Sequence, residues 1–182
     1  MSLKYKFFDK TDLYFVTYTV INWMDVFTSD IYRNVLLDSW NYCIKNKGLK
    51  IHAWCIMTNH VHMIISSDGE ELSNIMRDMK SFTSTTLKRI IADNPQESKK
   101  IRMLKMMKDA GTKNSNNNGF QFWKQHNHPI LLDTNYILDQ KLDYIHNNPV
   151  KKGFVDEPEN YLYSSARDYI GIKGLIEIEL IE

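Results

Sequence analysis

Apolar residues recur along this chain with two different periods, and the switches between them outline an alternation of strands and helices. A run of β-branched and aromatic residues at 13–21 predicts a strand. Residues 52–67 predict two more short strands joined by a tight turn at Thr58 and Asn59, and residues 175–181 predict a late strand. Apolar residues at helical spacing predict helices at residues 30–47, 71–92, 98–109, 135–147 and 161–170.

The predicted helix ends have recognisable signals. Ser29 and Asp30 can cap the first helix, and Gly48 supplies its stop. We expect the helix at 135–147 to end at Asn148 and Pro149, and we expect the small polar residues at 113–119 to form a loop. Together the elements predict an α+β fold in which helices flank an antiparallel sheet, without fixing the strand order.

Length and composition agree with that fold. The chain has 182 residues, of which 43% are hydrophobic and 25% charged, as in a globular protein rather than a disordered or disulfide-stapled one. We expect one domain over 1–182, with a core at about 10–170 and a C-terminal extension at about 171–182. The first residues lack an apolar signal core, no run of 18 apolar residues occurs, and the two cysteines have no C-x-x-C spacing, so we expect a cytoplasmic protein with reduced thiols.

Charge changes the picture only through its distribution. The net charge is +1, but residues 80–108 contain eight basic and two acidic side chains. Such a segment is either a phosphate-binding face or a solvated helix surface, and charge alone does not separate the two alternatives.

The candidate chemistry begins at His60 and His62, which open the second strand of the predicted hairpin. Residues two apart in a strand point to the same face, so both imidazoles leave one face and Val61 and Met63 the other. Two adjacent neutral imidazoles are a common start to a divalent metal site. Taken alone, an H-x-H pair is more often a pair of half-buried structural histidines.

A second candidate group lies on the predicted helix at 135–147. Tyr144 and Asn148 are four residues apart and share one helical face. An amide oxygen can join two imidazoles around a metal, and a phenol can attack a phosphodiester to form a covalent phosphotyrosine. The alternative is that Tyr144 packs in the core and Asn148 caps the helix end.

The segments that carry these residues resemble a known family. Residues 57–62 (MTNHVH) resemble the histidine–hydrophobic–histidine, or HUH, motif of single-tyrosine transposases. Three later segments resemble later blocks of the family and occur in the same order: residues 122–130 (FWKQHNHPI), 143–153 (DYIHNNPVKKG) and 161–166 (YLYSSA). The chain is most similar to the branch associated with repetitive extragenic palindromes, from the first strand to Tyr169.

This resemblance implies a ferredoxin-like or RRM-like HUH endonuclease sandwich. It implies an enzyme, a transposase that cuts and rejoins single-stranded DNA at hairpins with Mg²⁺ or Mn²⁺, as a monomer or homodimer. It makes Tyr144 the nucleophile, which leaves a 5′-phosphotyrosine, and it makes His60, His62 and Asn148 the metal ligands. Many members have proline where Thr58 stands, and some have glutamine where Asn148 stands.

Further residues are candidates for DNA contact. Lys80, Lys88, Arg89 and Lys124 are candidates for the backbone contacts that position DNA without reading its sequence. Trp123 is either a core residue or a stacking platform for an unpaired base. His126 and His128 repeat the H-x-H spacing, but Pro129 and the lack of a third ligand favour hydrogen bonding or DNA contact over a second metal site.

Two other functions compete with the transposase. One is a non-catalytic module of the same fold that binds single-stranded or hairpin nucleic acid. The other is a metal-dependent hydrolase that activates water, with Tyr144 structural. The simultaneous presence of both histidines and Tyr144 favours the transposase.

Overall fold

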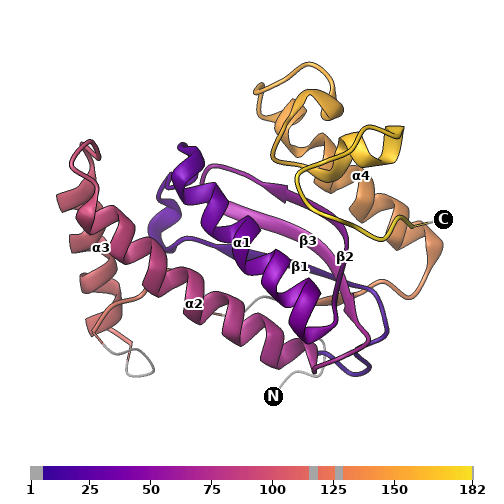
Figure 1. The fold of residues 1–182 in the computed structure, drawn as a ribbon, viewed down its shortest axis with the longest axis horizontal. Helices are drawn as coiled ribbons and strands as arrows, with labels where there is room; N and C mark the ends of the chain where they lie inside the picture. Colours follow the sequence, from indigo (N-terminus) through magenta and orange to yellow (C-terminus); the bar gives the residue numbers. More distant parts are fainter. Residues whose placement is uncertain (1–5, 115–118, 126–128, 182) are drawn as a thin grey trace.

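The computed structural model describes residues 6–114, 119–125 and 129–181, and its centre is a four-stranded antiparallel sheet (Figure 1). The strand order is β2-β3-β1-β4, and every neighbouring pair is antiparallel. The strands are β1 (Tyr14–Thr19), β2 (Leu49–Ile56), β3 (His60–Ser67) and β4 (Ile130–Leu131). This is the β-α-β-β-α-β arrangement of ferredoxin-like folds, as the family resemblance implied.

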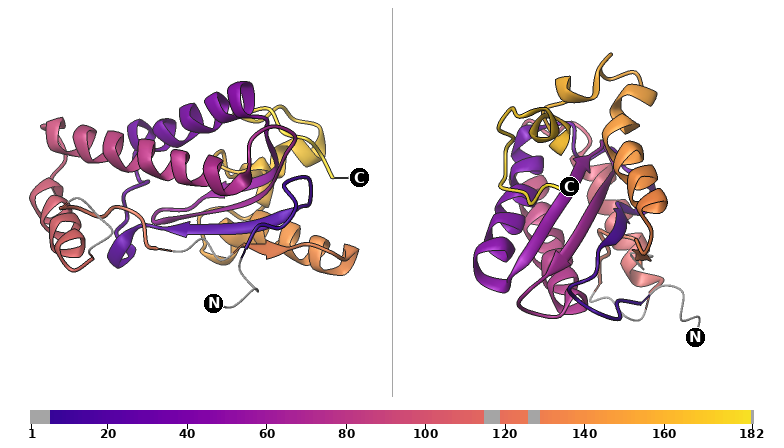
Figure 2. Two further views of the ribbon diagram at one scale, coloured as in Figure 1. Left: turned by 90° about the horizontal axis from the view of Figure 1, so that it is seen from below. Right: turned by 90° about the vertical axis from the view of Figure 1, so that its right-hand side faces the viewer.

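Helices cover both faces of this sheet. The helices are α1 (Asp30–Lys47), α2 (Leu72–Asp93), α3 (Lys100–Thr112) and α4 (Asn135–Lys151), with short 3-10 segments η2 (Ile21–Trp23), η3 (Pro158–Asn160) and η4 (Ser165–Ile170). Figure 2 shows α1 and α2 on one face of the sheet and α4 on the other. The helix α3 packs beyond the end of α2 and against η2.

The alternation of side chains in β3 separates two apolar clusters. Val61, Met63 and Ile65 belong to the larger cluster, which lies between the sheet and the helices α1 and α2. Ile64 belongs to the smaller cluster, which includes Ile145 of α4. The histidines of β3 therefore share the face that α4 covers.

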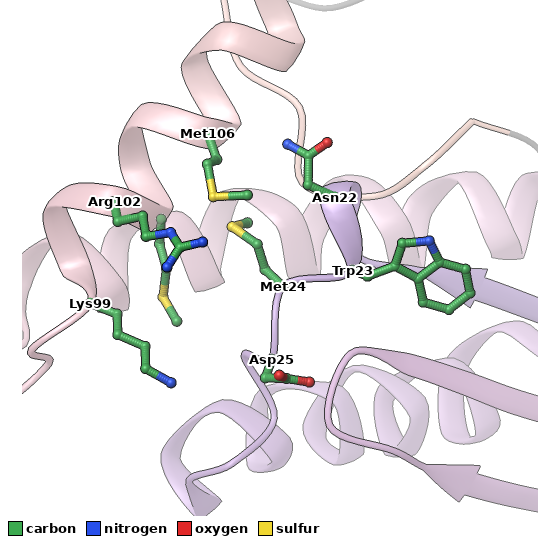
Figure 3. A pocket seen from close by; sticks show the side chains of 8 residues that line it. Asn22, Trp23, Met24, Asp25, Lys99, Arg102 and Met106 are labelled. Carbon is green, nitrogen blue, oxygen red and sulfur yellow. The ribbon is translucent and has the colours of Figure 1, made fainter.

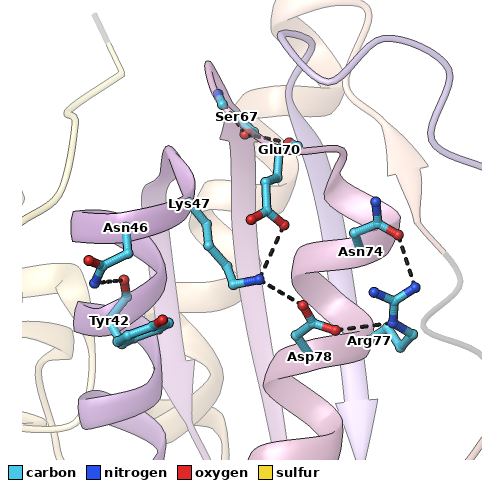
Figure 4. Close-up of polar contacts among 9 residues, drawn as sticks. Tyr42, Asn46, Lys47, Ser67, Glu70, Asn74, Arg77 and Asp78 are labelled. Atoms are coloured by element: carbon cyan, nitrogen blue, oxygen red, sulfur yellow. Dashed lines mark hydrogen bonds and ion pairs between the residues drawn. The ribbon is translucent and has the colours of Figure 1, made fainter.

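The helix α1 ends where the sequence predicted. Gly48 follows it in the left-handed region with φ of 71°, a conformation that glycine adopts without a steric penalty. Lys47, in the last turn, donates to Glu70 at 3.1 Å and to Asp78 at 2.7 Å, as Figure 4 shows. These contacts tie the end of α1 to the start of α2.

Several predictions about the elements were wrong. No strand was predicted at Ile130–Leu131, where β4 lies, and the predicted helix at 161–170 is present only as the 3-10 segment η4 from Ser165. Residues 175–181 do not form a strand, because only Glu179 pairs with the sheet, through its N–H to the carbonyl of Ile51. The helix α4 does not end at Asn148 and Pro149 but runs on to Lys151. Pro149 lies close enough to the helix end that the N–H groups of Gly153 and Phe154 can still bond the last carbonyls.

The C-terminal part of the chain protects the free edge of β2. The N–H of Ile56 donates to the carbonyl of Tyr163, and Cys55 forms an isolated bridge with Ser164. An exposed strand edge is a template for pairing with other chains, so this cover limits aggregation.

Cys43 and Cys55 are both free and buried. Within the described residues, no helix has the length and apolar character needed to span a membrane.

Candidate active site

The two histidines of β3 lie side by side, as the strand period predicted. Their ring centroids are 4.7 Å apart and their planes are inclined by 73°. His62 pairs across the sheet with Thr17 of β1 and Cys55 of β2, and His60 pairs with Thr19. Both imidazoles therefore rest on a rigid three-strand platform rather than on a loop.

Each imidazole has one nitrogen engaged and one available. The Nδ1 atom of His62 lies 2.7 Å from Thr17 Oγ1, and the Nδ1 atom of His60 lies 2.7 Å from Asn59 Oδ1. The Nε2 atom of His62 is buried and has no hydrogen-bond partner among the described residues. A buried nitrogen without a partner is costly, and this marks the position as a place for a further ligand.

Burial keeps both rings neutral at physiological pH. Burial lowers the pKa of His60 to about 4, with a smaller contribution from the charge of Lys152. It lowers the pKa of His62 to about 3, assisted by His60 and by the charge of Lys141. A neutral imidazole has a free lone pair on one nitrogen, which is the form that binds metal.

The turn before β3 fixes which nitrogen of His60 is free. The amide nitrogen of Asn59 donates to Asp25 Oδ1 at 2.8 Å and to the carbonyl of Trp23 at 3.2 Å. The amide oxygen of Asn59 is therefore turned toward His60 and accepts from Nδ1–H. Thr58 Oγ1 donates to the same Asp25 oxygen at 2.6 Å. This network leaves the Nε2 lone pair of His60 unoccupied by hydrogen.

The helix α4 brings Tyr144 to the same place. The ring of Tyr144 lies 5.0 Å from that of His62 and 6.0 Å from that of Phe15, edge-on to both. Tyr144 is 38% exposed, so a substrate can reach it. The sequence placed the histidines and the tyrosine on separate elements, and the structure brings His62 and Tyr144 together within one chain.

Asn148 shares this face of α4 with Tyr144, one turn further on. Lys141 and Lys152 lie on the same face, and their charges act on His62 and His60 respectively. Asn148 lies between them along the helix and is buried. No described residue hydrogen-bonds its side-chain amide, and no three His, Cys, Asp or Glu side chains of the described part of the chain converge on a metal position.

Three of the basic candidates lie elsewhere. Lys80, Lys88 and Arg89 belong to α2, which covers the opposite face of the sheet from the histidines (Figure 2). Lys80 is half-buried, donates to the carbonyl of Lys124 at 2.9 Å, and has its pKa lowered to about 8 by burial. The ammonium of Lys88 lies 4.2 Å from the centre of the Phe120 ring.

The neighbouring residues Trp123 and Lys124 have different surroundings, one in the apolar core and the other beside the candidate site. Trp123 is buried, stacks on Phe27 and donates from Nε1 to Thr83 Oγ1, so it is the core residue and not an exposed stacking platform. Lys124 reaches the site, because its ammonium lies 4.2 Å from the centre of the Trp23 ring, which in turn lies against His60. His126 and His128 lie outside the described residues.

Several site residues were missed from the sequence. Lys141 and Lys152 could have been found from the sequence by their helical spacing. Lys141 lies three residues before Tyr144 and Lys152 eight residues after it, so both share the helical face of Tyr144. Thr17 and Asp25 carry no such signal, since each acts on a histidine or on its turn only after the sheet has formed.

The H-x-H pair on a ferredoxin-like sheet, faced by the helix that carries Tyr144, is the arrangement that the resemblance to single-tyrosine transposases implied. The comparisons with known proteins agree with a transposase. A family model described as transposase IS200-like matches residues 13–106, more than half of the chain. The chain therefore belongs to the IS200-like transposase family, whose members are enzymes. The matched region contains both histidines and ends before Tyr144.

A solved structure of a REP-associated tyrosine transposase bound to a REP hairpin has the same fold. The TM-score is 0.63 at 16% sequence identity, and the alignment covers 100% of this chain and 92% of that one. At this identity the likeness establishes the fold. A comparison with curated proteins gave no match.

Proposed function

We propose that this chain nicks and rejoins single-stranded DNA at hairpin sequences through a covalent 5′-phosphotyrosine at Tyr144, with a divalent metal at His60 and His62. The observation that carries the proposal is the position of His62. Its ring lies between those of His60 and Tyr144, and its buried Nε2 has no partner among the described residues. Membership of the IS200-like family and the shared fold support the same activity.

The residues present fit a hard or borderline divalent cation. The cation would be held by the imidazole nitrogens of His60 and His62 and by the amide oxygen of Asn148. Imidazole suits first-row transition metals, and the amide oxygen suits Mn²⁺ or Mg²⁺. When bound, such a cation polarises a phosphoryl oxygen and offsets the charge that develops there. Asn59 holds His60 in the tautomer with a free Nε2 lone pair, and Thr17 fixes the orientation of the His62 ring.

The covalent step follows from the position of Tyr144. Its phenolic oxygen attacks the scissile phosphorus, the bond from phosphorus to the 3′-oxygen breaks, and the 3′-oxygen takes a proton from water as that strand leaves with a 3′-hydroxyl. Because Tyr144 is partly exposed, the phenolic proton can pass to water. The ammonium of Lys141 lies 5.8 Å from the Tyr144 ring and can balance charge on the phosphate. The phosphotyrosine retains the bond energy that allows a second 3′-hydroxyl to be joined.

Hairpin DNA is the partner that the comparisons support, because the solved relative of the same fold is bound to a hairpin. Lys124, Lys141 and Lys152 surround the histidines and suit the scissile phosphate. Lys88 and Arg89 lie exposed on α2 and remain candidates for more distant backbone contacts. We place no DNA contact at Trp123, which is in the core.

One chain supplies both halves of this site. His62 and Tyr144 lie 5.0 Å apart between ring centroids without a second copy. We therefore propose cleavage in cis, by the tyrosine helix of the same subunit that carries the histidines.

The test is adduct formation on labelled hairpins with single-stranded flanks, taken from the DNA around the gene itself and run on a denaturing gel. With Mn²⁺ we expect a protein–DNA adduct that EDTA abolishes and that Tyr144→Phe lacks. Tyr136→Phe is the matched control, because Tyr136 lies on the same helix but is 76% exposed and makes no contact with the histidines.

Other outcomes favour the competing functions. Cleavage without an adduct that persists in Tyr144→Phe indicates a water-activating hydrolase. Binding without cleavage indicates a nucleic-acid-binding module. Mixing Tyr144→Phe with His62→Ala tests the cis arrangement: restored adduct formation would show that the tyrosine acts on the histidines of another subunit.

A further inference from the structure

The segment that joins β1 to α1 carries an unusual backbone beside the histidines. Asn22 and Trp23 both have positive φ, at 52° and 55°. Non-glycine residues rarely adopt this conformation, and two in succession are held only when the surroundings require it. Here Asn59 donates to the carbonyl of Trp23, and the N–H of Ile21 donates to the carbonyl of Phe122. The same Asn59 side chain orients His60, so the strained turn and the candidate site are held by one residue.

The result of this backbone is an exposed indole next to the site. Trp23 is 56% exposed, whereas Trp40, Trp54 and Trp123 are buried. Trp23 lines the same pocket as Lys99, Arg102 and Met106, but in Figure 3 its ring points away from these three side chains. Trp23 belongs to neither apolar cluster of the core, and backbone strain of this kind is concentrated at functional sites.

The surroundings of the indole match those of an unpaired nucleobase. The ring of Trp23 lies 5.9 Å from that of His60, and the ammonium of Lys124 lies 4.2 Å from its centre. Sites for single-stranded nucleic acid combine an aromatic face for the base with a cation for the backbone. Successive nucleotides of a stacked strand are about 3.4 Å apart, so the 5.9 Å between the rings of Trp23 and His60 spans fewer than two nucleotides. A base on Trp23 would therefore lie next to a phosphate at His60.

We propose that Trp23 is the stacking platform for an unpaired base next to the scissile phosphate, and that Lys124 contacts the adjoining phosphate. The proposal rests on the proposed function, since it places the scissile phosphate at His60 and His62. The base stacks on the indole, and the ammonium of the half-buried Lys124 moves to the phosphate that the base brings with it. Stacking on one face fixes the strand relative to Tyr144 without reading its sequence.

The test measures binding and not cleavage, in the Tyr144→Phe background, with a hairpin carrying its single-stranded flank. One nucleotide at a time near the cleavage position is replaced by an abasic one. We expect Trp23→Ala to weaken binding about five- to hundredfold, the range found for a stacked base. At the position of the stacked base, an abasic nucleotide should weaken binding to the Tyr144→Phe protein but not to the variant that also carries Trp23→Ala. The reason is that the alanine variant has already lost the stacking contact that the base makes. Tyr42→Ala is the control, since Tyr42 is 59% exposed on α1 but lies away from the histidines.

Intrinsic fluorescence gives a second measurement that needs no alanine variant. Because the other three tryptophans are buried, quenching on binding of the flanked hairpin should come from Trp23 and disappear in Trp23→Phe. A blunt hairpin without a flank should not quench. Penalties that add at every abasic position, or quenching that survives in Trp23→Phe, would overturn the proposal while adduct formation at Tyr144 still stood. If no DNA binds, both proposals fail.

Discussion

The hydrogen bond between Thr17 and His62 gives the sharpest test of the metal site. Thr17 Oγ1 lies 2.7 Å from His62 Nδ1, and the two residues face each other in the pairing of β1 with β3. Thr17→Val replaces the hydroxyl with a methyl group of similar size. The strand and its packing are retained, while Nδ1 of His62 loses its partner and the ring its fixed orientation.

The expected effects on folding and on metal binding differ in size. Losing one neutral hydrogen bond should lower the free energy of unfolding by about 1 kcal/mol. Losing the partner that orients a metal-binding imidazole typically costs about 10- to 100-fold in affinity. We therefore expect the Kd for Mn²⁺ to rise about 10- to 100-fold in Thr17→Val, which corresponds to about 1.4–2.7 kcal/mol.

Calorimetric titration with Mn²⁺ measures this change, and Thr19→Val is the matched control. Thr19 lies on the same strand, pairs with His60 in register, and makes no side-chain hydrogen bond to another described residue. Its Kd for Mn²⁺ should stay within about threefold of the unchanged protein, which is well below the effect expected of an orienting partner. Equal losses in both variants, or no loss in Thr17→Val, would refute the orientation of His62 by Thr17.

Three further predictions concern the helices. Gly48→Ala should lower the free energy of unfolding by about 2 kcal/mol or more in urea, because φ is 71° and the new Cβ would meet the backbone of Gly69; a loss under about 0.5 kcal/mol would contradict this. Burial lowers the pKa of His146 to about 4 from 6.5, so the unfolded chain takes up the proton first and stability is lost as the pH falls from 6.5 toward 4. His146→Gln, which can still bond Ser165, should remove about 2 kcal/mol of the loss between pH 7 and pH 5, and an unchanged pH profile would rule out that role. Asn148→Ala should weaken Mn²⁺ binding in the same titration, whereas Asn147→Ala on the same helix should not; equal affinities would exclude Asn148 as a ligand.

Local regularities of the chain were predictable because they depend on near neighbours. The two-residue period of β3 placed His60 and His62 on one face, and glycine at position 48 ended α1. The helical period placed Tyr144 and Asn148 on one face of α4. These inferences need only the geometry of an isolated strand or helix.

The completed site was decided by tertiary structure. Periodicity shows which residues share a face, but not which helix covers that face, and the apolar clusters on both sides of the sheet place α4 over the histidines. The same packing buries His62 enough to keep its ring neutral and brings Asp25 to the turn before β3.

The largest difference between sequence and structure lies at two tryptophans. Sequence reasoning considered Trp123 for stacking and did not consider Trp23, yet Trp123 is buried and Trp23 is exposed beside His60. Nothing in the residues around position 23 predicts a positive φ, because contacts with Asn59 and Phe122, far away in the sequence, hold the turn. The sequence by itself determined most of the helices and strands and the chemical groups they carry, and the packing of distant segments decided which of those groups meet.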